Sequence, residues 1–361
     1  MSEPPIPVEI DGRPIGAGYP AYVIAELSGN HNGELSRALR LLDLAKAAGV
    51  DAVKIQTYRA DTLTIDHVAK EFFVEGGLWH GRRLYDLYDE AHTPWEWHEP
   101  MFDYARKIGL TLFSSPFDFT AVDLLESLDA PAYKIASPEL IDLPLIKYIA
   151  RLGRPMILST GMATEIEIKE AIDTAVFGGA EGVIVLHCTS AYPTKPEDAN
   201  LATINEIRQK FGVITGLSDH TESHQIAALA AVLGADVIEK HFTLDRSDGG
   251  VDSAFSLEPD ELELLVGQVK LSRLAIGRPT FAPTEAESSV LRNRRSLYVV
   301  EPVTAGEAFT PRNIRSIRPG NGLRPKHYES VLGKLASRDI GFGEPLDETM
   351  VTGGISTELN W

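Results

Sequence analysis

Two apolar runs in the second half of the chain each end in a cluster of polar residues that contains a histidine. Residues 213–220 end in His220, and residues 237–243 contain His241. Val and Ile favour buried strands, where charged side chains are rare unless they have a partner or a function. Strands that turn polar at their carboxyl ends line the active sites of barrels and doubly wound sheets. We therefore expect the two imidazoles to lie side by side at one rim and to hold a metal.

Other predicted strands also end in residues that could bind an anion or move protons. In chain order these are Glu26, Lys54, Gln56, Ser114, Lys134, Ser137, Glu139, Ser159, Ser190, Tyr192 and Ser218. Lysines and several hydroxyl groups at one rim suit a small, multiply charged anion such as a phosphorylated carboxylate. Two histidines near Asp219, Glu239 and Asp252 suit a divalent metal that polarises a carbonyl group. An anion and a polarised carbonyl together indicate carbon–carbon bond formation rather than hydrolysis.

The elements that must position these residues alternate between strand and helix from about residue 21 to 276. The predicted strands are 21–27, 52–58, 111–117, 132–137, 156–161, 183–189, 213–219 and 237–243. Amphipathic stretches between and after them are predicted helices, for example 35–48, 95–108, 165–177, 222–233 and 260–275. Eight strands, each followed by a helix, predict an α/β fold of the (β/α)8 TIM-barrel type. A doubly wound sheet would usually show a glycine-rich turn after its first strand, and residues 26–31 lack that form.

Two segments depart from this alternation. Residues 61–94 form a long, aromatic connection, and loops of this length are usually lids or dimer contacts. We expect Trp79 in this segment to pack or to form an interface rather than to bind substrate. Prolines and polar residues predict a linker over 281–295, so that a barrel domain (1–280) precedes a small, mostly β module (296–361).

The amino-acid composition limits the classes of partner and function that the chain can have. The chain has 34 basic and 52 acidic residues and a net charge of -18, which argues against nucleic acid or an anionic membrane as a partner. The single cysteine, Cys188, excludes an intrachain disulfide and is typical of a reducing compartment. No apolar stretch is long enough to span a bilayer, and the first residues lack a signal-peptide pattern. We therefore expect a cytoplasmic protein.

Several motifs resemble those of the sialic acid synthase family. They are IAELSGNHN at 24–32, KIQT at 54–57, YKIAS at 133–137, HCTS at 187–190, GLSDHT at 216–221 and EKHFT at 239–243. RRSLY at 294–298 and RPGNG at 318–322 resemble the family's antifreeze-like (SAF) module. These enzymes condense phosphoenolpyruvate with an open-chain N-acetylated sugar to make nonulosonic acids.

Within the family, the chain is most similar to the pseudaminic acid synthase branch. The similarity lies in ELS at 26–28, in the segment from GGLW at 76–79 to residue 98, and in VDSAFS at 251–256. Ser253 stands where the sialic and legionaminic acid branches tend to carry His, and Ser190 where the sialic branch tends to carry Asn. The resemblance thus implies condensation with 2,4-diacetamido-2,4,6-trideoxy-altropyranose and water, giving pseudaminic acid and phosphate by C–O cleavage.

The resemblance also implies roles for the candidate residues. His220 and His241 would hold a divalent metal, typically Mn²⁺, with Mg²⁺ or Co²⁺ as alternatives. The residues that would bind phosphoenolpyruvate or assist are Lys54, Gln56, Ser114, Lys134, Ser137, Ser159, Ser190 and Ser218. The catalytic candidates, which would contact the sugar or move protons, are Glu26, Glu139, Asp252 and Tyr192. Arg318 would reach across a domain-swapped homodimer to bind an N-acetyl group at the partner's barrel.

Three other interpretations stay open. The enzyme could make N-acetylneuraminate or legionaminate, from N-acetylmannosamine or a diacetamido-trideoxy-mannose. The same fold could host a Schiff-base aldolase with Lys134 or Lys54 as nucleophile. A non-enzymatic protein could use the last module for surface or ice binding. That module, however, carries Arg312, Arg315 and Lys326 and is not flat and threonine-rich.

Overall fold

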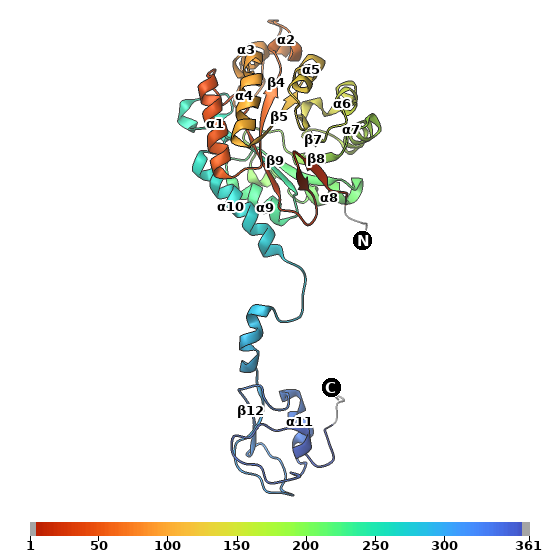
Figure 1. Ribbon diagram of the computed structural model, residues 1–361, viewed down its shortest axis with the longest axis vertical. Helices are drawn as coiled ribbons and strands as arrows, with labels where there is room; N and C mark the ends of the chain where they lie inside the picture. The colour runs from red at the N-terminus through yellow and green to blue at the C-terminus, as the bar shows by residue number, and fades with distance from the viewer. Residues whose placement is uncertain (1–4, 356–361) are drawn as a thin grey trace. The chain divides into compact units, whose positions relative to one another are not determined.

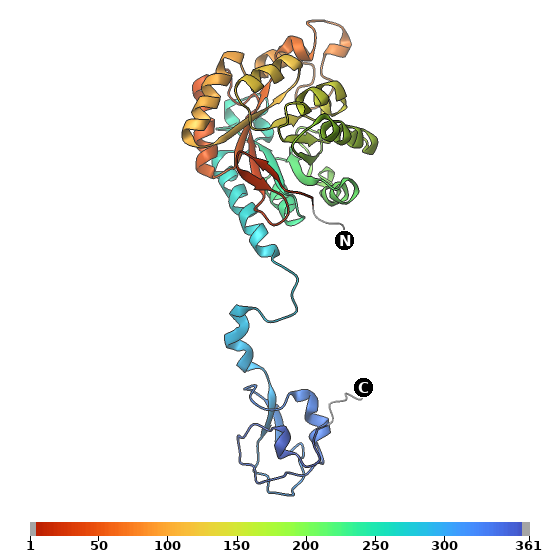
Figure 2. The same cartoon turned by 45° about the vertical axis from the view of Figure 1, so that its right-hand side comes forward.

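The computed structural model describes residues 5–355, which lie in two separate compact units, Met1–Gly277 and Arg278–Trp361. In the first unit a ring of strands is surrounded by helices (Figures 1 and 2). No helix within residues 5–355 combines the length and the hydrophobicity that a membrane crossing requires.

The first unit is a closed barrel of eight parallel strands. In chain order they are β3 (Tyr22–Glu26), β4 (Ala52–Thr57), β5 (Thr111–Pro116), β6 (Tyr133–Ile135), β7 (Met156–Ser159), β8 (Val183–Cys188), β9 (Ile214–Asp219) and β10 (Val237–His241). β10 pairs with both β9 and β3, which closes the ring. Because helices cover the outside, both faces of each strand are buried, and this explains the continuous apolar runs. The predicted TIM barrel is confirmed.

The outer helices begin and end where capping chemistry places them. The main ones are α1 (Leu35–Ala48), α4 (Trp95–Ile108), α5 (Phe119–Ser127), α6 (Leu143–Ala150), α7 (Glu165–Gly178), α8 (Thr203–Phe211), α9 (His224–Val232) and α10 (Pro259–Ile276). α7 starts at a capping box in which the backbone N–H and hydroxyl of Thr164 donate to the Glu167 carboxylate. α1 and α4 end at Gly49 and Gly109, whose φ angles of 81° and 66° favour glycine.

Short helices connect these elements. The 3-10 helices in the later loops of the barrel unit are η2 (Pro138–Ile141), η3 (Pro196–Asp198), η4 (Arg246–Asp248) and η5 (Ser253–Phe255). The long connection after β4 contains α2 (Ala60–Leu63), η1 (Lys70–Phe72) and α3 (Leu84–Ala91). It is thus a folded segment, in which Phe73 and Arg83 form an antiparallel bridge.

A hairpin that the sequence analysis missed fills one end of the barrel. Its strands are β1 (Val8–Ile10) and β2 (Arg13–Ile15). Val8, Ile10 and Ile15 are buried in one cluster with Tyr22 and Val237, the first residues of β3 and β10. The amino end of the barrel is therefore filled with apolar side chains, and the polar side chains gather at the carboxyl end. Each hairpin strand has only three residues, which is too short to show a period.

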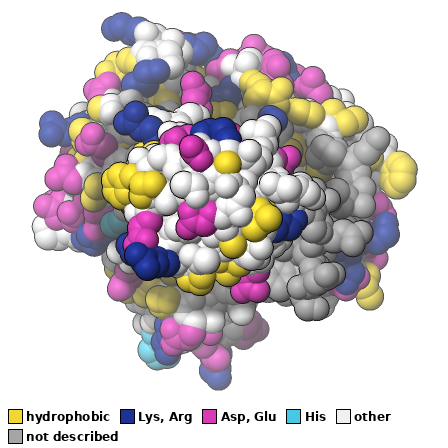
Figure 3. Space-filling model, turned by 90° about the horizontal axis from the view of Figure 1, so that it is seen from below, with side chains coloured by type: hydrophobic (Ala, Val, Ile, Leu, Met, Phe, Trp, Pro, Cys, Tyr) yellow, Lys and Arg dark blue, Asp and Glu magenta, His cyan; other side chains and the backbone are white. Residues whose placement is uncertain are grey.

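The second unit has a small core of its own. Its elements are η6 (Glu285–Asn293), β11 (Ser296–Val299), β12 (Ile314–Ile317), η7 (Pro325–His327), α11 (Tyr328–Val331) and η8 (Glu348–Met350). β11 and β12 pair antiparallel over a cluster that includes Leu297 and Phe309. The exposed helix η6 lies in the stretch for which we expected a linker, and Thr284 with Glu287 caps it. On the face drawn in Figure 3, acidic and basic side chains are interspersed.

Candidate active site

Inward-facing side chains at the carboxyl ends of the strands form a buried charged cluster. Lys54 Nζ lies 2.7 Å from Glu26 Oε2 and 3.7 Å from Glu239 Oε1. Lys134 Nζ lies 3.6 Å from the same Glu239 oxygen and donates to Ser159 Oγ at 2.6 Å. Buried ammonium groups need such partners, because an unpaired charge in this environment would cost several kcal/mol. The cluster holds both predicted lysines side by side.

Glu239 is the central residue of this cluster, and the sequence analysis named it only as a neighbour of the histidines. Its Oε1 atom lies near both lysines and accepts a hydrogen bond from Ser218 Oγ at 3.0 Å. Its Oε2 atom is buried without a hydrogen-bond partner among the described residues. The signal was present in the alternation of the strand, since Glu239 and His241 are two apart and face the same side.

The charge states follow from burial and from these pairs. Burial opposes the charge of Glu239, but Lys134 and Lys54 outweigh it and hold the pKa of this carboxyl below its usual range. Burial also lowers the pKa of Lys134. For Lys54, Glu239 and Glu26 overcome the burial and raise the pKa, so this ammonium group is charged. Lys54 and Glu239 thus form an ionised pair at the base of the site.

The two histidines lie together as expected, with ring centroids 5.2 Å apart. His220 Nδ1 lies 3.1 Å from the carbonyl oxygen of Thr189, and His241 Nδ1 lies 3.2 Å from Ser28 Oγ. Neither Nε2 atom has a hydrogen bond within residues 5–355. An Nδ1–H that donates to a carbonyl oxygen leaves Nε2 of His220 as a ligand atom, which is the usual support of metal-binding histidines. Burial lowers the pKa of His241 well below its usual range, which favours the neutral ligand form.

The pair fits a metal that takes only part of its ligands from the protein. Among the described residues no three His, Cys, Asp or Glu side chains converge as a complete metal site would require. Two open imidazole nitrogens beside a cavity leave the remaining positions to substrate or water, as in catalytic metal sites. Ser28, which contacts His241, has a φ of 42°, and such backbone strain is most often found at functional sites.

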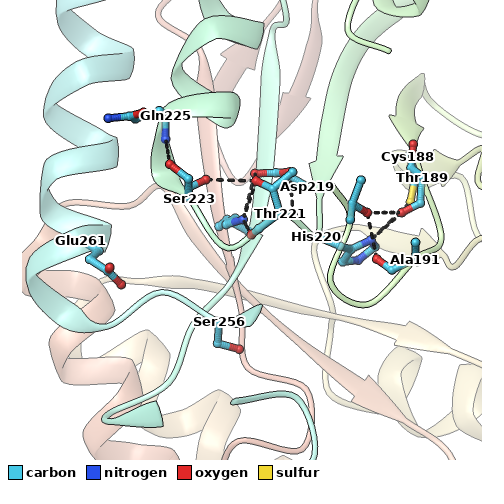
Figure 4. Close-up of polar contacts among 12 residues, drawn as sticks. Cys188, Thr189, Ala191, Asp219, His220, Thr221, Ser223, Gln225, Ser256 and Glu261 are labelled. Carbon is cyan, nitrogen blue, oxygen red and sulfur yellow. Dashed lines mark hydrogen bonds and ion pairs between the residues drawn. The ribbon is translucent and has the colours of Figure 1, made fainter. Parts of the chain in front are cut away.

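Asp219 does not belong to this site, although we expected a carboxylate there. It accepts from Lys240 Nζ at 2.8 Å and from the hydroxyl of Thr221 at 3.0 Å. Figure 4 shows Asp219 and Thr221 together on one side, while His220 points the other way, toward Cys188 and Thr189. Neighbouring residues of a strand point to opposite faces, so Asp219 and Lys240 form a buried pair outside the barrel.

A cavity of about 400 Å³ opens above the charged cluster. The predicted residues that line it are Lys54, Gln56, Lys134, Ser137, Glu139, Ser159, Tyr192, Ser218, His220, His241 and Asp252. A cavity of this size accommodates a small ligand. The structure thus brings eleven of the predicted residues around one space. A second cavity of about 300 Å³ is lined by other residues, among them Glu9 and Arg154, and shares none with the first.

Four predicted residues, Glu26, Ser114, Ser190 and Arg318, do not line this cavity. Ser114 is fully buried and contacts Thr57 Oγ1 at 2.6 Å, and Thr57 in turn contacts His98 on α4. The inward-facing serine is Ser115, whose Oγ accepts a hydrogen bond from Lys54 Nζ at 3.2 Å. Glu26 has no exposed surface, and its carboxylate is held by Lys54 and by Gln56 Nε2 at 3.0 Å. Ser115 rather than Ser114 therefore faces the charged cluster, and both Ser115 and Glu26 contact Lys54 there.

Gly161 is a further residue that the sequence analysis did not single out as functional. Its N–H donates to Ser137 Oγ at 3.0 Å. A Cβ atom at this position would lie 2.7 Å from Ser137 Oγ and 2.0 Å from Ser190 Oγ. Only glycine therefore lets the two hydroxyl groups approach the end of β7. Ser190 does not line the cavity directly but lies beside this glycine.

The carboxyl groups of Glu139 and Asp252 at the cavity differ in their pKa shifts and in their hydrogen bonds. Burial raises the pKa of Glu139 to about 7, and its Oε2 atom has no hydrogen-bond partner among the described residues. Burial also raises the pKa of Asp252. A carboxyl group with a pKa near 7 and a free oxygen is suited to proton transfer, so Glu139 is the stronger candidate base.

The segment after β4 forms part of the cavity wall. Trp79 lines the cavity, and its Nε1–H donates to the carbonyl oxygen of Val251 at 2.9 Å. Its ring lies 5.3 Å from that of Tyr192, which is 4.5 Å from that of His220. Trp79 thus packs against Tyr192, as expected, and also forms part of the cavity lining. Arg318 lies exposed in the second unit and does not line this cavity.

Two family models and several known proteins match this chain over most of its length. Residues 41–280 match the NeuB family and residues 294–352 match the SAF domain. The chain is 44% identical to a pseudaminic acid synthase of Campylobacter jejuni, over 91% of this chain and 96% of that protein. It is 35% identical to an N,N'-diacetyllegionaminic acid synthase of the same species, over 90% and 98% of the two chains.

A solved structure agrees with the fold. The N-acetylneuraminic acid synthetase of Leptospira borgpetersenii, crystallised with citrate, is 30% identical and superposes with a TM-score of 0.72, over 80% of this chain and 95% of that one. The matched family covers the barrel from β4 to β10, and the matched relatives cover nearly the whole chain. This chain is a NeuB-family enzyme that ends in a SAF domain.

Proposed function

We propose that this enzyme condenses phosphoenolpyruvate with 2,4-diacetamido-2,4,6-trideoxy-altropyranose and water, giving pseudaminic acid and phosphate. One observation carries the proposal: a pair of buried lysines and a pair of open histidines face the same cavity. The identity of 44% to pseudaminic acid synthases, against 35% to a legionaminic acid synthase, supports this sugar. Family membership favours condensation over a Schiff-base aldolase or an inert barrel.

The lysine side of the cavity would bind phosphoenolpyruvate. Lys54 and Lys134 supply positive charge, and Ser159 and Ser218 supply hydroxyl groups beside them. The hydroxyl group of Ser137, which accepts from the Gly161 N–H, extends this set, and such donors suit phosphate and carboxylate oxygens. Both lysines already lie beside Glu239, and Lys54 is charged before the anion arrives.

The histidine side would bind the sugar aldehyde. A divalent metal held by His220 and His241, with manganese as the first choice and magnesium or cobalt as alternatives, would supply Lewis-acid polarisation of the aldehyde. Asp252 and Tyr192 border this side and would orient the sugar hydroxyl groups.

The reaction forms one carbon–carbon bond and breaks one C–O bond. The enol carbon of phosphoenolpyruvate bonds to the aldehyde carbon, and water adds at the carbon that bears the phosphate. Glu139 would accept a proton from this water, because its free oxygen and its pKa of about 7 suit a base. Collapse of the resulting hemiketal phosphate then releases phosphate with its original bridging oxygen.

We also propose that the enzyme acts as a domain-swapped homodimer in the cytoplasm, where phosphoenolpyruvate is made. In this arrangement Arg318 of one protomer would bind an N-acetyl group at its partner's barrel. The exposed position of Arg318 at the end of β12 leaves its guanidinium available for such a contact.

The test is a mass-spectrometric assay in ¹⁸O-labelled water with phosphoenolpyruvate, manganese and three sugars. The sugars are N-acetylmannosamine and the two diacetamido-trideoxy hexoses of altro and manno configuration. We expect the altro sugar to react fastest, the label to enter the sugar acid and not the phosphate, and a chelator to stop the reaction. A faster reaction with another sugar would overturn the substrate assignment, and label in free phosphate would overturn C–O cleavage.

A further inference from the structure

One wall of the active-site cavity is apolar and comes from the connection after β4. Its aliphatic members are Leu63, Val74, Leu84 and Leu87, which we call the apolar wall. Trp79 from the same connection lies beside them in the lining. The charged floor of the cavity, in contrast, is built from strand ends of the barrel. The cavity therefore has two regions of different chemistry, supplied by different parts of the chain.

The helix α3 turns its apolar face to the cavity, and this face does not belong to the barrel core. Leu84, Leu87, Tyr88 and Ala91 follow the i, i+3, i+4, i+7 spacing of one helical face, and all four line the cavity. Among the described residues, the apolar wall belongs to neither hydrophobic cluster of the barrel. Leu87 and Ala91 of this stripe are already buried, whereas Leu84 and Tyr88 are half-buried and keep surface that a ligand can cover.

The wall is held in place by backbone and side-chain contacts. The Val74 N–H donates to the carbonyl oxygen of Arg82 at 2.9 Å, and the Gly81 N–H donates to the carbonyl oxygen of Val74 at 2.9 Å. Trp79 is tied to Val251, the neighbour of Asp252. A preformed apolar surface can select between ligands, because it does not have to be ordered on binding.

We propose that the apolar wall binds the methyl end of the sugar and makes the enzyme prefer a 6-deoxy, doubly N-acetylated hexose over N-acetylmannosamine. This inference rests on the proposed function for the chemistry of the sugar. With phosphoenolpyruvate at the lysines and the aldehyde at the histidines, the far end of the sugar is left to face the wall. The two sugars differ at that end, where one carries a C6 methyl group and a second acetamido group and the other carries hydroxyl groups.

The expected preference for the trideoxy sugar can be estimated from the burial of its methyl group against the apolar wall. An apolar surface gains from a methyl group and leaves a hydroxyl group without its water partners. Hydrophobic pockets discriminate such pairs by about 10- to 200-fold, and this is the selectivity that the wall can supply. The wall contacts substituents rather than ring stereochemistry, so it should not set the choice between altro and manno configurations.

Matched substitutions on one segment test the inference. Val74→Thr keeps the shape of a wall residue and adds a hydroxyl group, and Val68→Thr makes the same change at a residue that is 76% exposed. Leu84→Gln is a second wall variant. We expect each wall variant to lower the ratio of kcat/KM for the trideoxy sugar over that for N-acetylmannosamine by about tenfold, through the KM of the sugar. The KM of phosphoenolpyruvate and the Tm should stay unchanged, and Val68→Thr should keep the wild-type ratio.

The outcomes separate the two proposals. Wild-type enzyme that prefers the trideoxy sugar, with wall variants that keep the same ratio, would overturn the role of the wall alone. Wild-type enzyme that prefers N-acetylmannosamine would overturn the proposed function and this inference with it. A wall variant that changes the altro-to-manno ratio as strongly would also contradict the inference, because the wall would then read stereochemistry.

Discussion

The charged cluster places two ammonium groups around one carboxylate before any substrate is bound. Glu239 lies within 3.7 Å of Lys54 and Lys134, and all three side chains are buried. Without Glu239, two positive charges would face each other in a region of low dielectric constant. The carboxylate therefore keeps Lys54 charged and holds both lysines in place, and an arriving anion finds a site that is already organised.

Glu239→Gln should lower the stability of the free enzyme and increase its stabilisation by phosphoenolpyruvate. Breaking a buried charge pair by removing one partner typically costs about 3–5 kcal/mol, and the anion would replace part of the lost charge. Differential scanning fluorimetry with and without phosphoenolpyruvate measures both effects. Glu165→Gln, which removes an exposed carboxylate paired with Lys210, should change neither. An equal Tm shift by phosphoenolpyruvate in the Glu239→Gln variant and wild type would contradict the charge-balancing role.

The rate should depend on the ionisation of Glu139. Burial raises its pKa to about 7, so the carboxyl group is largely protonated below that pH. A base works only when it is deprotonated, and kcat/KM should therefore rise with pH up to about 7 and then level. Glu139→Gln should lower kcat by about 10²- to 10⁴-fold and remove this limb of the pH profile. A profile that falls through pH 7 in wild type would instead assign Glu139 as an acid.

At the scale of elements, β9 and β10 show which parts of the site the sequence could predict. Both strands alternate, so His220 and His241 face inward while Asp219 and Lys240 face outward. The two histidines could be predicted because each lies at the polar end of an apolar run. The choice between Ser114 and Ser115 needed the register of β5, and a shift of one residue exchanges the two faces.

Other elements could not be predicted because their signals are not local. The hairpin of β1 and β2 is too short for a period and is stabilised by contacts with strands far along the chain. The place of Trp79 in the cavity lining could not be predicted, because its hydrogen-bond partner, the Val251 carbonyl, lies 172 residues away. Glu239 could have been found from its spacing to His241, since both face inward.

Lys240→Met should destabilise the barrel without changing the charged cluster. It leaves Asp219 buried without its cation, so the free energy of unfolding should fall by about 3–5 kcal/mol. In the double variant Lys240→Met with Asp219→Asn, the remaining side chain is neutral and part of the stability should return. Urea denaturation measures both. Equal stability of the single and double variants would contradict a coupled pair.

At the scale of the whole molecule, the chain contains two units, each with its own core. The barrel core and the cluster around Leu297 and Phe309 do not share residues. Two such units can exchange partners between protomers, and a closed dimer would supply Arg318 to a barrel in trans. Whether Arg318 serves its own barrel or the barrel of its partner can be tested by mixing two variants.

Mixing two inactive variants should restore activity if Arg318 acts in trans. His220→Ala removes a barrel residue and Arg318→Ala removes the guanidinium, so each homodimer should be inactive. A mixed dimer would contain one intact site, made from the barrel of one protomer and Arg318 of the other. With random pairing, half of the dimers are mixed and each has one good site of two, so about a quarter of the wild-type kcat should return. Light scattering verifies that both variants are dimers. Mixed dimers that stay inactive would show that Arg318 serves its own barrel, and monomers of full wild-type activity would overturn the exchange altogether.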